Sequence, residues 1–173
     1  GAGMMRMRPG LIAGMVLNDI GPVIDPAGLA RIGGYIGEND QWTDWDDAVN
    51  TLKKVNAVVY PDFTHEDWLN FVRNTCRINE DGKVVQDYDP AIAQAFADDC
   101  ASDLDLWPLF ETLGSAPALL VRGALSDLLS AETAREMTKR VSDLNLVIVE
   151  NRGHVPTLTE PAALSAIEAF VEQ

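Results

Sequence analysis

The stretch ALLVRGALSD at residues 118–127 decides the fold of this chain. Ala118 to Val121 are apolar without interruption, which is typical of a short strand buried on both faces. The residues that follow place Asp127 just beyond the carboxyl end of that strand. A second apolar run at residues 146–149 is followed by a loop that contains His154. Because parallel strands end at one edge of a sheet, an acid and an imidazole are expected there together.

The rest of the chain extends this pattern of buried strands and helices. Ser130 is expected to cap a helix between the two strands, and Pro161 to open a final helix. A third continuous apolar run, at residues 11–17, predicts another strand buried on both faces. Strands that alternate with helices imply a parallel sheet, so the predicted fold class is α/β with three strands.

A mainly helical insertion is predicted between the first strand and the other two. Residues 25–113 show apolar residues at helical spacing, and Thr64 to Asp67 resemble a capping box. An Asp-Gly turn signal within residues 77–88 indicates a short β-hairpin. The predicted domains are a core of residues 1–24 and 114–173 and an insertion of residues 25–113.

Composition limits the possible functions. The chain has 173 residues, of which 47% are hydrophobic, which suits one compact domain or a small core with an insertion. Its net charge of −14 opposes binding to nucleic acid and to anionic membranes. No signal peptide or apolar run of about 18 residues is found, so a cytoplasmic protein is the default expectation. Cys76 is expected to be a buried free thiol, and two histidines without a Cys/His cluster predict no metal site.

The acid and the imidazole suggest a specific chemistry. A carboxylate can accept a hydrogen bond from one imidazole nitrogen, which fixes the tautomer and leaves the other nitrogen free to act as a base. Imidazole titrates near neutral pH, so it can take and return a proton within one reaction cycle. We therefore expect Asp127 to orient His154 as a general base.

Three segments resemble the α/β-hydrolase family. VRGALSDLLS at residues 121–130 is similar to the segment of the triad acid, and GHVPTLTEP at residues 153–161 is similar to that of the triad histidine. MVLNDIGP at residues 15–22 is similar to the strand and loop that precede the family's lid. The resemblance implies that Asp127 and His154 are triad members and that the insertion is a cap that covers a pocket and selects substrates.

The nucleophile of that family is absent from this sequence. The family's serine lies in a Gly-x-Ser-x-Gly elbow, one helix before the strand at residues 11–17, and no such motif occurs here. The chain alone is therefore expected to be inactive, with the serine supplied from outside it. The strand that leads to the elbow is missing too, which would leave an apolar edge at residues 11–17. A second copy of the chain, a complementary N-terminal chain or its own rearranged helices could cover this edge.

Asp19 is a second candidate for the acid. Some α/β-hydrolases place the acid after the strand that corresponds to residues 11–17. The preferred interpretation is that Asn18 and Asp19 shape the pocket wall through backbone hydrogen bonds, because Asp127 already fits the role of the acid.

Other residues are assigned on similar grounds. Trp107 is predicted either to line a substrate pocket or to pack in the core, and both interpretations stay open. Val155, next to the histidine, is the remaining predicted substrate contact. Ser126 and Ser130 are interpreted as a turn residue and a helix cap.

Three functions are compatible with the sequence. The first is a C-terminal portion of a hydrolase that acts on a small ester, lactone or related carbonyl compound without a cofactor. The second is a naturally truncated, non-catalytic binding or assembly module. The third, direct activation of water by Asp127 and His154, lacks identifiable oxyanion donors.

Overall fold

The computed structural model describes residues 2–8, 10–37, 40–94 and 104–173. These residues form two compact units, one made of Gly1–Leu29 with Asp103–Gln173 and the other of Ala30–Ser102. Cys100 lies outside the described residues, as does the part of the predicted insertion around Phe96. No helix in the described ranges has both the length and the apolar character needed to cross a membrane.

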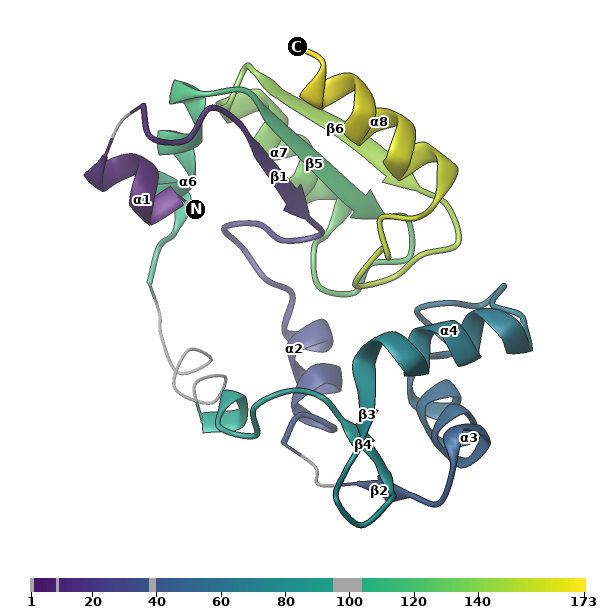
Figure 1. The fold of residues 1–173 in the computed structure, drawn as a ribbon. Helices are drawn as coiled ribbons and strands as arrows, with labels where there is room; N and C mark the ends of the chain where they lie inside the picture. Colours follow the sequence, from purple (N-terminus) through teal and green to yellow (C-terminus); the bar gives the residue numbers. More distant parts are fainter. Residues whose placement is uncertain (1, 9, 38–39, 95–103) are drawn as a thin grey trace. The chain divides into compact units, whose positions relative to one another are not determined.

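The first unit is built on a parallel sheet of three strands. Strands β1 (Met15–Asn18), β5 (Ala118–Gly123) and β6 (Leu144–Val149) lie in the order β1-β5-β6 (Figure 1). The α/β fold class predicted from the sequence is thereby confirmed.

The first strand differs from its prediction in length and burial. It begins at Met15, so Leu11, which is 60% exposed, lies outside it. Val16, within the strand, is 37% exposed rather than buried on both faces. Among the described residues β1 pairs only with β5, so its other edge has no partner strand to bury it.

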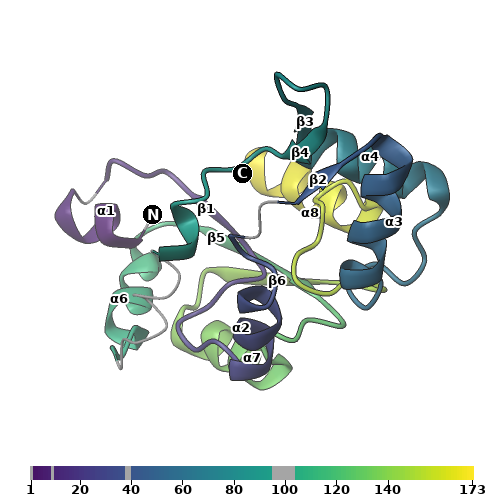
Figure 2. The same ribbon diagram turned by 90° about the horizontal axis from the view of Figure 1, so that it is seen from below.

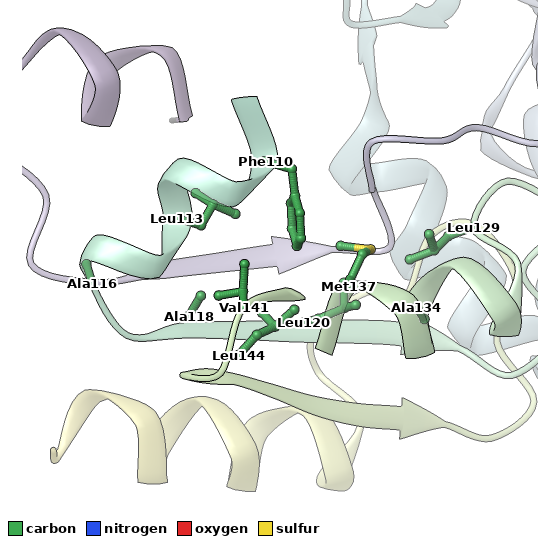
Figure 3. Packing of buried hydrophobic residues seen from close by; sticks show 10 residues of the cluster. All are labelled: Phe110, Leu113, Ala116, Ala118, Leu120, Leu129, Ala134, Met137, Val141 and Leu144. Atoms are coloured by element: carbon green, nitrogen blue, oxygen red, sulfur yellow. The ribbon is translucent and has the colours of Figure 1, made fainter. Parts of the chain in front are cut away.

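Helices cover both faces of this sheet. The short helix α6 (Trp107–Glu111), the 3-10 turn η1 (Thr112–Ser115) and α7 (Ala131–Arg140) pack on one face, and α8 (Pro161–Val171) packs on the other (Figure 2). All six residues of β5 are buried, because its side chains alternate between two faces that are both covered by helices. Leu120 faces the α7 side, where Figure 3 shows it among Phe110, Met137 and Val141, and Leu119 faces α8.

The predicted caps form. Ser130 Oγ accepts a hydrogen bond from Thr133 N at 2.9 Å at the start of α7, and Pro161 begins α8. A short helix α1 (Ala2–Met7) contacts α6 and η1.

The boundary between core and insertion differs from the prediction. The segment that leads into β5, including α6, was expected within the insertion at 25–113, yet it belongs to the first unit. Phe110 and Leu113 are buried in the core beneath the sheet. Helical spacing in a sequence does not distinguish a helix that packs on the sheet from one in the insertion. The end of the insertion was therefore predicted too far along the chain.

The second unit has its own small core. Helix α2 (Pro26–Gly33) begins in the first unit and continues into this one, followed by α3 (Trp45–Asn56) and α4 (His65–Thr75). Strands β2 (Gln41–Trp42), β3 (Cys76–Ile78) and β4 (Val84–Gln86) form an antiparallel sheet in the order β2-β4-β3. The predicted hairpin is therefore present, with β2 added to it.

Two local predictions for this unit are confirmed. Thr64 and Asp67 form the capping box of α4, with Asp in the place usually held by Glu. Cys76 is a free, buried cysteine, and burial raises the pKa of its thiol.

We predict that Leu120→Ala destabilises the first unit by about 3 kcal/mol, because it removes a fully buried side chain and leaves a cavity under β5. Urea unfolding followed by circular dichroism measures the loss. Ile148→Ala on β6, where the side chain is 39% exposed, is the control and should cost clearly less. Equal losses for the two variants would contradict the described packing.

Candidate active site

Asp19 follows β1 directly, and its side chain is fully buried. Its backbone N–H donates to Val121 O at 2.7 Å, which extends the β1–β5 ladder by one residue. Its φ of 55° lies in the left-handed region, which Asp adopts more readily than most residues. The chain turns there, and Asp19 Oδ1 accepts a hydrogen bond from Gly123 N at 2.9 Å, at the end of β5.

His154 lies in the loop after β6 and meets this carboxylate. Its Nδ1 is 2.9 Å from Asp19 Oδ2 and 3.2 Å from Asp19 O, and 20% of its side chain is exposed. Both oxygens can only accept hydrogen bonds when the carboxylate is ionised, so Nδ1 must carry the proton. In the neutral imidazole this leaves Nε2 with a lone pair, which is the state that a general base requires.

The carboxylate that contacts His154 Nδ1 is that of Asp19, the second candidate from the sequence, and the orienting role predicted for Asp127 stays a prediction. Asp19 makes the backbone hydrogen bonds expected of it and, in addition, this side-chain contact with the imidazole. The physical reason is register: Asn18 pairs with Val121, so residues that follow β1 reach the same edge as residues that follow β5. The alternative in which the acid follows the first strand has the support of this geometry.

Asp127 occupies the turn between β5 and α7 and is half-buried. Its carbonyl oxygen packs against Gly28, where an added Cβ would lie 2.6 Å from it. A role for Asp127 in orienting His154 stays a prediction.

The loop that contains His154 is held against the sheet by two close contacts. Asn18 Nδ2 donates to Pro156 O at 3.0 Å, which ties the end of β1 to the residues after the histidine. Gly123 lies under the loop, and an added Cβ would come within 2.5 Å of Gly153 O, so only glycine fits there. Asn18, predicted as a substrate contact, has this structural role in the protein as described.

A buried ion pair spans the two ends of the same loop. Arg152 Nε donates to Glu160 Oε1 at 2.8 Å, and Thr157 donates to the same oxygen from N at 3.1 Å and from Oγ1 at 3.0 Å. Burial by itself raises the pKa of the Glu160 carboxyl. The hydrogen bonds from its own backbone, from Thr157 and from Arg152 outweigh burial and hold that pKa below its ordinary value.

Trp107 is half-buried against the core of the first unit. Its ring makes an edge-to-face contact with Phe110 at 5.7 Å, and the Arg140 guanidinium lies over it at 4.1 Å. The same ring lines a surface hollow together with Glu132 and Glu136 of α7. Both interpretations of Trp107 therefore stay open.

The remaining predicted contact is Val155, which is half-buried directly after His154. In the described ranges, no three His, Cys, Asp or Glu side chains come together as ligands for a metal ion.

Comparisons with known proteins agree with this fold. No family model matches the chain. It is 32% identical to a 3-hydroxybutyrate-oligomer hydrolase from Cupriavidus necator, over 98% of this chain and 60% of that protein. An α/β hydrolase from Novosphingobium aromaticivorans is similar in structure with a TM-score of 0.92 and 37% identity, over 99% of this chain and 60% of that one. An E-2-(acetamidomethylene)succinate hydrolase shares the fold with a TM-score of 0.78 and 20% identity, over 99% of this chain and 62% of that one.

These likenesses define the fold of the chain. The chain has part of the α/β-hydrolase fold and corresponds to a C-terminal portion of it. It spans about 60% of the length of the relatives that it matches.

We predict that Asp19 and His154 are energetically coupled. A double-mutant cycle of Asp19→Ala and His154→Ala should give a coupling of about 0.5–3 kcal/mol in the free energy of unfolding, because the two side chains share a buried hydrogen bond. The matched cycle of Asp127→Ala with His154→Ala should give a smaller coupling. A larger coupling for Asp127 than for Asp19 would favour Asp127 as the orienting acid.

We also predict that Glu160 makes the fold sensitive to acid. Its folded pKa lies below the ordinary 4.5, so its stabilisation is complete above that pH and is lost as pH falls through the folded value. Glu160→Gln should therefore flatten the decline in unfolding free energy below about pH 4.5. Glu150→Gln, at an exposed carboxyl that follows β6, should keep the wild-type slope. An unchanged slope in Glu160→Gln would show that the loop does not depend on this charge.

Proposed function

We propose that this chain supplies the acid–base pair of an ester hydrolase whose nucleophile lies outside the chain. The observation that supports this most strongly is the 2.9 Å contact between His154 Nδ1 and the buried Asp19 carboxylate. It lies beyond the carboxyl ends of parallel strands, where open α/β sheets bind ligands. The matched relatives are hydrolases, which supports the same class of reaction.

The reaction follows from the direction of the hydrogen bond. Asp19 holds the proton on Nδ1, so His154 Nε2 can take the proton of a serine hydroxyl as its oxygen attacks the ester carbonyl carbon. Asp19 then stabilises the imidazolium that forms. His154 returns the proton to the leaving alcohol. In the second half-reaction it deprotonates the water that attacks the acyl carbon and then gives that proton to the serine oxygen as the acid leaves.

Short esters are the proposed substrates. The name of the Cupriavidus necator relative specifies oligomers of 3-hydroxybutyrate, which are linked by ester bonds. In this proposal Val155, next to the base, contacts the substrate, and the second unit serves as the cap that selects it. No cofactor takes part in the proposed steps.

The nucleophile is proposed to come with a complementary N-terminal segment that pairs along β1. The outer edge of β1 lacks a partner strand among the described residues. Beside it lies an apolar hollow of about 420 Å³, whose lining includes Met15, Val16, Leu109 and Leu113. The chain covers 60% of each of the two matched relatives, and the remaining 40% of their length is enough for such a segment. A strand with a following apolar helix would satisfy the open edge and fill the hollow.

Reconstitution tests this function. We expect that co-expression with the N-terminal segment of the Novosphingobium aromaticivorans hydrolase gives a one-to-one complex that cleaves p-nitrophenyl butyrate. His154→Ala should lower kcat by about 10³-fold or more, because the serine loses its base. The complex is verified by light scattering.

Two outcomes would contradict the proposal. A one-to-one complex that is as inert as its His154→Ala variant would remove the hydrolase function and favour a binding module. A stable homodimer that excludes the added segment would show that a second copy of the chain covers β1.

A further inference from the structure

The hydroxyl of Ser126 is a third group on the buried Asp19 carboxylate. Ser126 lies in the turn between β5 and α7, and its Oγ donates to Asp19 Oδ2 at 2.6 Å. The same carboxylate oxygen contacts His154 Nδ1 at 2.9 Å. Two hydrogen bonds through Asp19 Oδ2 therefore link Ser126 to the imidazole, although its sequence context indicates only a turn residue.

The direction of this hydroxyl is determined by its other partners. Its oxygen accepts hydrogen bonds from Leu129 N at 3.0 Å and from Leu128 N at 3.3 Å. A serine hydroxyl has one proton and two lone pairs, so with both lone pairs engaged the proton is directed to Asp19. Two amide donors on the oxygen also polarise the O–H bond and strengthen its donation.

The turn that presents Ser126 is itself fixed to the core. Arg122 Nε donates to Leu129 O at 2.9 Å, and Asp25 N donates to Leu128 O at 2.9 Å. Ser126 N closes the turn on Gly123 O at 3.0 Å. The hydroxyl therefore has little freedom to leave the carboxylate.

Both oxygens of the fully buried Asp19 carboxylate accept hydrogen bonds. Gly123 N serves Oδ1, whereas Oδ2 is shared by Ser126 Oγ and His154 Nδ1. An ionised group without such donors is costly to bury, so the carboxylate would rotate or take up a proton if Ser126 withdrew. Either change would weaken the contact that keeps the proton on Nδ1.

We propose that Ser126 is a positioning residue, whose hydroxyl holds Asp19 Oδ2 where it fixes the Nδ1–H tautomer of His154. Its importance for catalysis rests on the proposed hydrolase function, but its effect on the imidazole does not. The two can be tested apart.

The test measures the tautomer of His154 by ¹⁵N NMR of the imidazole in three variants of Ser126. Ser126→Ala removes the donor, Ser126→Cys keeps the shape with a weak donor, and Ser126→Thr keeps the hydroxyl. We expect the alanine and cysteine variants to show a mixture that includes the Nε2–H tautomer, and the threonine variant to retain the wild-type spectrum.

Ser130→Ala is the matched control. Ser130 lies in the same connection and caps α7, so its loss weakens the fold without touching Asp19. Its imidazole signals should stay at the wild-type positions. Wild-type signals in both Ser126→Ala and Ser126→Cys, or an equal change in Ser130→Ala, would overturn the proposal.

The reconstituted complex gives the catalytic readout. We expect Ser126→Ala to lower kcat about tenfold or more with KM unchanged, as for a lost hydrogen bond to a charged group. A wild-type complex without activity, combined with an altered imidazole in Ser126→Ala, would refute the hydrolase function and leave the positioning role intact. An altered imidazole with undiminished kcat would refute its contribution to catalysis.

Discussion

The hydrogen bond between Asp19 and His154 is the constraint that organises the first unit. It joins two loops that are 135 residues apart in the sequence, and each loop follows a different strand of one parallel sheet. The two strands are not neighbours, because β5 lies between them. The end of β5 therefore has to accommodate both loops, and Gly123 does so by donating its N–H to Asp19 and by leaving space beneath the histidine loop.

Two buried carboxylates near this hydrogen bond, those of Asp19 and Glu160, accept hydrogen bonds from neighbouring polar groups. Asp19 is surrounded by donors from β5, from the turn after it and from His154. Glu160 is served by Arg152 and Thr157 and closes the histidine loop from its far end. Donors offset the cost of burying a carboxylate, and here they serve both oxygens of Asp19 but only Oε1 of Glu160.

Much of the fold follows from local sequence signals. The apolar runs of β5 and β6, the Ser130 cap and the Thr64 capping box are all short-range features, and the structure has each of them. The sequence named both Asp19 and Asp127 as candidates for the acid, but the contact of Asp19 with His154 depends on the register between β1 and β5 and on the left-handed backbone of Asp19, which no local pattern reveals. The hydrogen bond from Ser126 to Asp19 could not be predicted either, because hydroxyl groups in turns ordinarily bond only to the backbone nearby.

The contact with the Asp19 carboxylate keeps the proton of a neutral His154 ring on Nδ1 and leaves the lone pair on Nε2. The most direct measurement is the ¹⁵N spectrum of the His154 imidazole in the wild-type chain, at a pH where the ring is neutral. We expect a protonated Nδ1 and an unprotonated Nε2. A ring that carries its proton on Nε2, with Nδ1 bare toward Asp19, would contradict it.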